Sequence, residues 1–204
     1  MAHDSSWERV RLHTDRLRLR VPDVRDTDGL YALFADPDVM SGLGKDPAST
    51  HDEARAMIDD GIGGWRTDGL GPFVIETAAA TDRRVVGQAG LMVFDTRGWT
   101  ASTFADAGSH AQPELGWALI PAHWGNGYAT EAAAAIRDWA YENRSIGRLV
   151  SLISPGNVRS ERVAQRLGAI AVETVTPADT GRPTVVWRHQ PWGTRDPIAG
   201  FTFP

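Results

Sequence analysis

The alternation of polar and apolar positions predicts the strands at the start of the chain. Residues Arg16 to Val21 alternate strictly and end at Pro22, which is the pattern of a half-buried strand. Two longer apolar runs, Pro72 to Thr77 and Val85 to Phe94, are separated by a turn sequence around Thr81-Asp82-Arg83. These runs predict a meander of neighbouring strands that leads into the middle of the chain.

Helical spacing predicts two helices between the first strand and the meander. The first begins near Asp26-Thr27-Asp28, which can cap it, and its apolar residues recur on one face. Ser49 or Thr50 can cap the second helix, and Glu53 is placed to complete a capping box. We expect this second helix to weaken at Gly61-Ile62-Gly63-Gly64, because glycine is a poor helix former.

The segment from Gln112 to Ala169 has the most regular order of elements. It predicts a strand over Pro113–Ile120, a glycine-rich turn over Trp124–Thr130 and an alanine-rich helix over Glu131–Tyr141. A second strand over Arg148–Ile153 and a second helix over Asn157–Gly168 follow. Two more strands, Ala171 to Thr176 and Thr184 to His189, follow it. Before it, Asp95 to Ala111 is a polar loop that is long for a hairpin. This order predicts a mixed α/β (α+β) chain around one sheet.

Composition and length fit a single domain over residues 1–204. The 204 residues suffice to bury a core, with residues 1–13 expected as a loose leader and 191–204 as an irregular tail. A net charge of −5 argues against a general nucleic-acid binder, which normally carries a basic face. There is no cysteine, signal sequence or membrane-spanning stretch, so we expect a cytoplasmic protein without a membrane partner.

The glycine-rich turn has the form of a phosphate site, although the turn alone is a weak signal. A strand that leads through small residues into a helix brings backbone N–H groups and the positive end of the helix dipole to an anion. The turn matches neither a P-loop nor a dinucleotide fingerprint. In isolation, Gly125 and Gly127 are better explained by a tight strand-to-helix connection. The ordered elements around the turn favour the phosphate site.

Four stretches together resemble the GCN5-related N-acetyltransferases (the GNAT superfamily), and more narrowly the RimJ/RimL branch that acetylates protein N-termini. They are Glu114–Pro121, Trp124–Ala132, Asn157–Ser160 and Arg166–Ala169, and the opening Thr14–Arg20 is also typical of that branch. The resemblance implies the GNAT fold. That fold is a single mixed, mostly antiparallel sheet with a splayed parallel strand pair at its centre and helices on its flanks.

The resemblance also implies acetyl-CoA as the co-substrate, and no metal. In such proteins backbone N–H groups of the turn hold the pyrophosphate, here those of Trp124, Gly125, Asn126, Gly127, Tyr128, Ala129 and Thr130. The family commonly begins this turn with Gln or Arg, whereas the RimJ/RimL branch often has an aromatic residue there. The pantetheine arm meets Asn157 and lies along the central strand at Trp117, Leu119 and Ile120. In such proteins the central strand parts from the next strand, here Leu149–Ile153. Parting strands leave backbone groups unpaired, and an amide-containing arm can satisfy them.

Glu114 is the candidate general base, because the family commonly places a carboxylate at the start of the central strand. Alternation puts Glu114, Gly116 and Ala118 on one face of that strand and Leu115 and Trp117 on the other. The small residues therefore leave room beside the carboxylate. An α-amino group titrates at about 8, so a modest base suffices for an N-terminal amine. The alternative is an ordinary strand-entry carboxylate in water.

The helix after the second strand carries the other catalytic candidate. Asn157 three residues before Ser160, at a helix start, is also ordinary capping chemistry. Many relatives place a tyrosine acid further along this helix, where this chain has Ala164. The resemblance to the RimJ/RimL branch assigns Ser160 to stabilise or protonate the leaving thiolate. A backbone N–H of Leu119 or Ile120 would polarise the thioester carbonyl.

The resemblance implies direct acetyl transfer to a primary amine, with the N-terminal α-amine of a protein, such as a ribosomal protein, as the preferred acceptor. Two alternatives stay open: an amine-bearing small molecule such as an antibiotic or polyamine, and a catalytically silent acyl-CoA-sensing module. The helices before Trp65 and the 95–111 loop are expected to shape the acceptor groove, and the tail would suit a homodimer contact. His51-Asp52-Glu53 resembles a metal cluster only in composition.

Overall fold

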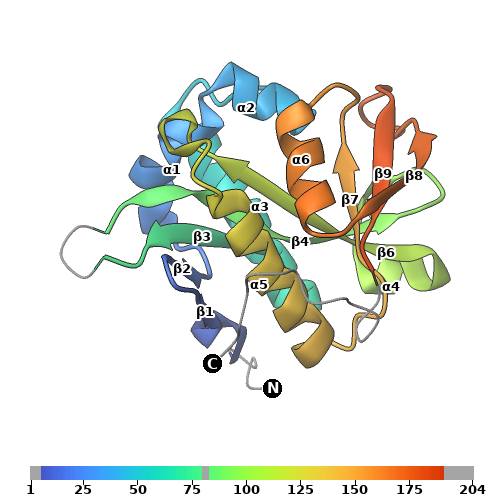
Figure 1. Ribbon diagram of the computed structural model, residues 1–204, viewed down its shortest axis with the longest axis horizontal. Helices are drawn as coiled ribbons and strands as arrows, with labels where there is room; N and C mark the ends of the chain where they lie inside the picture. Colours follow the sequence, from blue (N-terminus) through green and yellow to red (C-terminus); the bar gives the residue numbers. More distant parts are fainter. Residues whose placement is uncertain (1–5, 80–82, 191–204) are drawn as a thin grey trace.

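One mixed sheet runs through the whole computed structural model, which describes residues 6–79 and 83–190 (Figure 1). The nine strands of this sheet follow the spatial order β1-β2-β3-β4-β6-β7-β9-β8, with β5 paired to β4. Their bounds are β1 Arg11–His13, β2 Leu17–Arg20, β3 Pro72–Thr77, β4 Val85–Asp95, β5 Thr100–Ser102, β6 Ala111–Leu119, β7 Val150–Ile153, β8 Ile170–Val175 and β9 Thr184–Arg188. All paired neighbours are antiparallel except β6 and β7.

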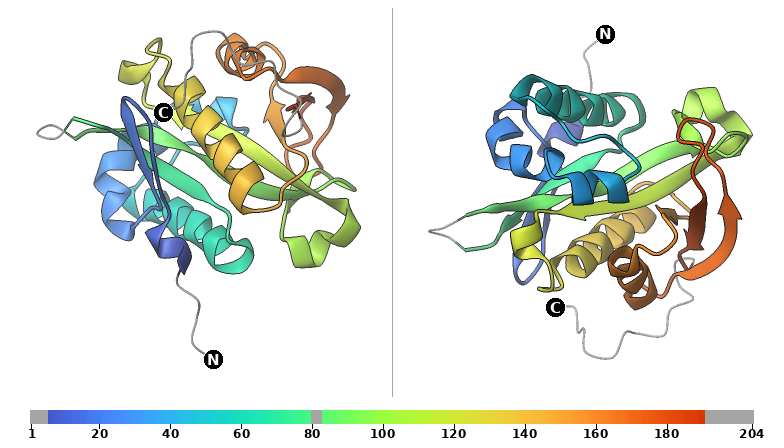
Figure 2. Two further views of the ribbon diagram at one scale, coloured as in Figure 1. Left: turned by 60° about the horizontal axis from the view of Figure 1, so that its bottom comes forward. Right: turned by 90° about the horizontal axis from the view of Figure 1, so that it is seen from above.

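Helices cover both faces of the sheet. One layer contains α1 (Thr27–Phe34), α2 (Pro37–Gly42) and α3 (His51–Asp68), and the other contains α5 (Tyr128–Asn143) and α6 (Val158–Arg166) (Figure 2). The short α4 (Phe104–Ala107) lies beyond β5. Four 3-10 turns complete the described elements: Ser6–Arg9, Val24–Asp26, Gly108–His110 and Pro121–His123. The expected single sheet with flanking helices is confirmed.

The central strand β6 separates the two cores as its alternation predicts. Leu115 and Leu119 belong to the apolar cluster on the α5 side, and Trp117 packs against it. Ala118 belongs to the cluster of the α1–α3 layer. Because successive side chains of a strand point to opposite faces, Glu114 and Gly116 share the face of Ala118. The carboxylate therefore lies on the side of the sheet that α1, α2 and α3 cover.

The parallel strands β6 and β7 part soon after they meet, which confirms the expected splay. Within the described strands, their register pairs Glu114 with Val150 and records no further pair. The Ser151 hydroxyl secures this junction by donating to the Leu115 carbonyl at 2.6 Å. The same oxygen lies 2.9 Å from Nε2 of His189, which is buried. The strands are thus fixed at one end and separate toward the glycine-rich turn.

Three expectations about local structure are wrong. The proposed loose leader contributes β1, whose residues pair with β2. The second helix does not weaken at Gly61 but continues to Asp68, because this glycine allows close contact with another segment: a Cβ built there would lie 2.6 Å from Pro72 Cγ. The 95–111 loop contains β5, α4 and a 3-10 turn. Packing against Pro72 overrides the local preference at Gly61, whereas β1 and β5 each form a short antiparallel pair with a strand that is near in the sequence.

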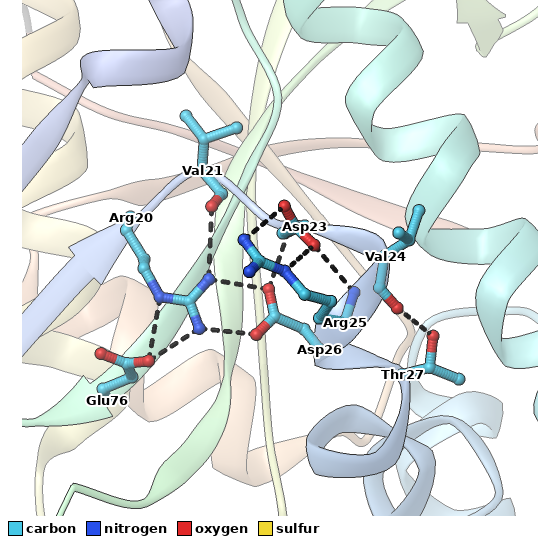
Figure 3. Close-up of polar contacts among 8 residues, drawn as sticks. All are labelled: Arg20, Val21, Asp23, Val24, Arg25, Asp26, Thr27 and Glu76. Carbon is cyan, nitrogen blue, oxygen red and sulfur yellow. Dashed lines mark hydrogen bonds and ion pairs between the residues drawn. The ribbon is translucent and has the colours of Figure 1, made fainter.

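A partly buried ion-pair network fastens the start of α1 to the sheet (Figure 3). The Arg20 guanidinium donates to both carboxylate oxygens of Asp26, at 2.7 and 2.6 Å. It also donates to Oε1 of Glu76 on β3, at 2.9 and 2.7 Å. Two opposite charges beside the guanidinium raise the pKa of Arg20 further above its already high value. The α1–α3 layer is therefore anchored where β2 ends.

Candidate active site

The glycine-rich turn presents an uncapped helix end. Gly125 and Gly127 both have left-handed backbone angles, with φ of 79° and 78°, which only glycine adopts at little cost. Gly127 is the N-cap of α5, and no described side chain caps this end by a hydrogen bond. The first N–H groups of the helix are therefore open to a ligand, with the positive end of the dipole behind them. Tyr128, Ala129 and Thr130, expected in the turn, form the first turn of α5.

Thr130 adds a polar group to this helix end. Its hydroxyl oxygen is buried and has no hydrogen-bond partner in the described part of the chain. A buried hydroxyl without a partner is unfavourable unless a ligand or water satisfies it. The open N–H groups and this hydroxyl together fit an anionic ligand such as a pyrophosphate.

Arg16 and Glu131 hold the turn from outside, a role that sequence reasoning did not assign to either residue. Glu131, buried in the first turn of α5, accepts from the Thr14 hydroxyl at 2.5 Å and from Arg16 Nε at 2.7 Å. The same guanidinium donates through Nη1 to the Asn126 carbonyl at 3.0 Å. Arg16 thus joins the segment before β2 to both the turn and α5.

Trp124 fixes the beginning of the turn to the end of β6 and to α6. Its indole N–H donates to the Leu119 carbonyl at 2.8 Å. The Arg159 guanidinium lies 3.9 Å from the centre of the indole ring, within the range of a cation–π contact. Trp124 therefore acts through its side chain as well as its backbone, and it bridges the two helices that flank the splay.

Hydrogen-bond directions along β6 determine which backbone groups face the splay. The Ile120 N–H donates to the Val86 carbonyl at 2.9 Å, so it is engaged with the β4 side. The Ile120 N–H is therefore not available to polarise the thioester carbonyl, which corrects that part of the prediction. The Leu119 N–H stays a candidate for this role. Because these directions alternate along an antiparallel strand, the N–H groups of Trp117 and Leu119 point toward the gap beside β7.

Glu114 lies where β6 and β7 part. Its Oε1 accepts from the Leu152 N–H of β7 at 3.3 Å, and its carboxylate extends over Gly116, where a built Cβ would be 3.3 Å from Oε2. Burial raises the pKa of Glu114 from its ordinary value of 4.5 to about 7, against the smaller lowering effects of the Leu152 N–H and the Lys45 charge. This carboxyl group can accept or release a proton near neutral pH.

The start of α6 places the remaining candidates. Asn157 is the N-cap, and its Oδ1 accepts from the Ser160 N–H at 3.2 Å. Ser160 is half-buried, and its hydroxyl makes no hydrogen bond to any described residue, so it is available to a ligand. Ala164 is fully buried against Ile153 and other apolar residues, so this position supplies no acid. The capping role of Asn157 is confirmed.

Other residues named in the sequence analysis make ordinary packing and hydrogen-bond contacts. The His51 ring stacks on Tyr31 with ring centres 3.9 Å apart, at the start of α3. Trp65 is fully buried and donates from its indole to the Pro72 carbonyl. Across residues 6–79 and 83–190, no group of three or more His, Cys, Asp or Glu residues could hold a metal ion. No helix in those ranges has the length and apolarity needed to cross a membrane.

A sheet splayed at its centre, an open helix end beside the splay and a carboxyl group poised near neutrality define an acetyltransferase of the GNAT type. Sequence comparison agrees, because the model of the acetyltransferase (GNAT) domain family matches residues 16–170. The chain belongs to this family.

Relatives and solved structures support the same assignment. The uncharacterized protein YkkB of Bacillus subtilis (strain 168) is 34% identical over 174 residues, covering 82% of this chain and 89% of that protein. The acetyltransferase structure from Agrobacterium tumefaciens str. C58 has a TM-score of 0.70 at 29% identity, covering 89% of this chain and 94% of that one. RimL, a ribosomal L7/L12 α-N-protein acetyltransferase solved with coenzyme A, has a TM-score of 0.67 at 15% identity, over 88% and 97% of the two chains. The last likeness shows the fold alone.

Proposed function

We propose that this protein transfers acetyl from acetyl-CoA directly to the N-terminal α-amine of a protein. The observation that carries this proposal is the position of Glu114, a carboxyl group of pKa about 7 at the point where β6 and β7 part. Acetyl transfer to an amine requires a proton acceptor at the reacting centre, and this group is poised to be one at neutral pH.

The open end of α5 and the edge of β6 are suited to acetyl-CoA. The N–H groups from Trp124 to Thr130 and the Thr130 hydroxyl would hold the pyrophosphate. The edge of β6 that faces the splay, with Trp117 on it, would hold the pantetheine arm, and Asn157 lies at the start of the facing helix. Bound there, acetyl-CoA supplies an activated acyl group on a thiol leaving group.

The pKa of Glu114 favours an α-amine over a lysine side chain. Moving a proton to a group of pKa about 7 from an α-ammonium of pKa about 8 is unfavourable by about 1.4 kcal/mol. The same transfer from a lysine of pKa about 10.4 is unfavourable by about 4.6 kcal/mol. Positioning of an amine that is already partly neutral then supplies much of the rate.

Two further groups complete the proposed chemistry. The Leu119 N–H would donate to the thioester carbonyl as its oxygen gains negative charge. The Ser160 hydroxyl, at the start of α6, would donate to the departing thiolate, since the buried Ala164 cannot take the role of an acid. Neither role requires a covalent intermediate on the enzyme.

The acceptor would approach from the α1–α3 side, which Glu114 faces. The end of α2 and the segment after it lie close to Asn157 and Thr180: a Cβ at Gly42 would be 3.2 Å from Asn157 Nδ2, and one at Gly44 would be 3.6 Å from Thr180 Cγ2. The fold shared with RimL, whose name describes α-N-protein acetylation, supports a protein N-terminus such as that of a ribosomal protein.

The first test is calorimetric binding of acetyl-CoA, followed by thiol release with matched acceptors. One peptide has a free α-amine and no lysine, and its partner has an acetylated N-terminus and one lysine. Spermidine and an aminoglycoside represent small amines. We expect binding near one to one and turnover only with the free α-amine.

Each other outcome identifies an alternative. Turnover confined to spermidine or the aminoglycoside would replace the protein acceptor by a small molecule. Binding without turnover on any amine would favour a silent acyl-CoA-sensing module. Absence of acetyl-CoA binding would leave the glycine-rich turn as a steric connection and overturn the proposal.

A further inference from the structure

A second pocket lies at the opposite end of β6 from the glycine-rich turn. It has a volume of about 300 Å³ and is formed by the beginning of β6, by Phe104 of α4 and by residues 144–148 between α5 and β7. This volume is at the lower end of the range of small-molecule sites. Because β6 ends next to the turn and begins at this pocket, the pocket is separate from the proposed acetyl-CoA site.

Two arginines give the pocket a positive charge, and neither forms an ion pair with a described carboxylate, although Asp68 accepts from the backbone N–H of Phe104, another lining residue, at 3.0 Å. Arg144 and Arg148 both line it, and neither guanidinium has a hydrogen bond or an ion pair to any described residue. Nε of Arg144 is buried and has no partner among those residues. A buried guanidinium N–H without an acceptor is unfavourable, so the protein alone leaves this site unsatisfied.

The Arg144 guanidinium is held in place rather than free in solvent. It lies 5.0 Å from the ring centre of Trp139, in a cation–π contact, and a Cβ at Gly69 would be 3.6 Å from its Nη1. Ser145, the next residue, has a left-handed φ of 52°, which is unusual for a residue with a side chain. This left-handed residue follows the C-cap of α5 and ends the helix there, so the Arg144 guanidinium is held by Trp139 and by the backbone at Gly69.

Apolar surface completes the pocket. Phe104 is 38% exposed at its edge, although aromatic side chains of this size are usually buried. Ile146, also in the lining, is buried. A ligand that matches the pocket therefore has an anionic head for the two guanidiniums and a small apolar body for the side of Phe104.

We propose that this pocket binds a small organic carboxylate. Planar guanidinium groups match the two oxygens of a carboxylate through paired N–H donors. The occupant would sit beside Pro113, directly before Glu114, and beside Arg148, two residues before the Val150 that pairs with Glu114. It would not compete with acetyl-CoA, because the two sites lie at opposite ends of β6.

Benzoate is a suitable probe, with benzamide as its neutral counterpart of the same shape. Binding to the full-length protein is measured by calorimetry for the wild type and for Arg144→Gln, Arg148→Gln and the matched control Arg55→Gln, an exposed arginine on α3. We expect a dissociation constant that is roughly millimolar. The affinity should fall roughly tenfold or more in each pocket variant and stay unchanged in the control.

Two further measurements test whether benzoate binds in this pocket. The Arg144 Nε–H resonance in a ¹⁵N-labelled sample should shift with benzoate and not with benzamide, and acetyl-CoA affinity should be equal with and without benzoate. No benzoate binding up to roughly 50 mM, or equal loss of affinity in Arg55→Gln, would overturn the proposal. If Arg144→Gln fails to fold, Arg148→Gln alone decides, because its side chain is exposed.

Discussion

Arg16 and Glu131 connect two segments 115 residues apart in the chain and thereby position the glycine-rich turn. The Arg16 guanidinium donates through Nε to Glu131 at 2.7 Å and through Nη1 to the Asn126 carbonyl at 3.0 Å. The Glu131 side chain is 7% exposed, whereas that of Arg16 is 51% exposed. The pair therefore acts as a clamp on the turn, with the carboxylate as its buried half.

Arg16→Gln should weaken acetyl-CoA binding more than it slows the chemical step. Loss of the guanidinium frees the Asn126 carbonyl and leaves the buried Glu131 carboxylate without its charge partner. We expect KM for acetyl-CoA to rise roughly tenfold with kcat within about twofold, since the substitution removes binding rather than transition-state contacts. Steady-state kinetics measure both constants.

Arg18→Gln is the control for this clamp, because Arg18 lies on β2 and makes no side-chain hydrogen bond or ion pair with the described residues. Glu131→Gln combined with Arg16→Gln should recover part of the lost thermal stability, since no buried charge then lacks a partner. An unchanged KM in Arg16→Gln would exclude the clamp from cofactor binding.

Activity should increase with pH through the titration of Glu114. The basic form is the carboxylate, so kcat/KM should rise toward a plateau with an inflection at about pH 7. Glu114→Gln should lower the plateau roughly 100-fold and remove that inflection. A pH–rate profile of both proteins measures this, and an inflection that persists in Glu114→Gln would assign it to another group.

The same carboxyl group should make stability depend on pH. Its folded-state pKa of about 7 lies above the ordinary 4.5, so the folded protein binds more protons than the unfolded chain between these values. The contribution to stability is complete below about pH 4.5 and is lost as pH rises through about 7. Relative to Glu114→Gln, the wild type should therefore lose unfolding free energy from pH 5 to pH 8, as denaturant titration would show.

Substitutions at Ser160 and Asn157 should distinguish a catalytic role from a helix-capping role. Ser160→Ala removes only the hydroxyl and leaves the backbone N–H that Asn157 caps. We expect kcat to fall roughly tenfold with unchanged Tm. Asn157→Ala removes the cap and should cost about 1 kcal/mol of stability. A Tm loss in Ser160→Ala equal to that in Asn157→Ala would give the serine a structural role.

The ion pairs of Arg20 and Arg25 should contribute different amounts to the free energy of unfolding (Figure 3). The Arg20 side chain is 24% exposed and pairs with both Asp26 and Glu76, so Arg20→Gln should destabilise by about 2–3 kcal/mol. The Arg25 side chain is 87% exposed beside Asp23, and Arg25→Gln should leave Tm unchanged because solvent screens that pair. Thermal unfolding of the two variants tests this directly.

Local patterns determined the elements whose residues interact mainly with near neighbours. The alternation over Arg16 to Val21 and the short apolar run over Pro72 to Thr77 are enough to predict β2 and β3, because each pattern is a property of one strand alone. The sequence predicts a cap at Ser49 or Thr50 for the same reason, and in the structure the Thr50 side chain accepts from the Glu53 N–H. The face carrying Glu114 also follows from alternation along β6.

Tertiary structure decided the features that depend on distant contacts. Gly61 does not end α3, because the helix passes close to Pro72, which no local pattern specifies. Ile120 is engaged by Val86 of the neighbouring strand, so only the sheet register separates its N–H from that of Leu119. The partnership of Arg16 with Glu131 and the meeting of Phe104 with Arg144 at one pocket likewise arise only when remote segments pack together.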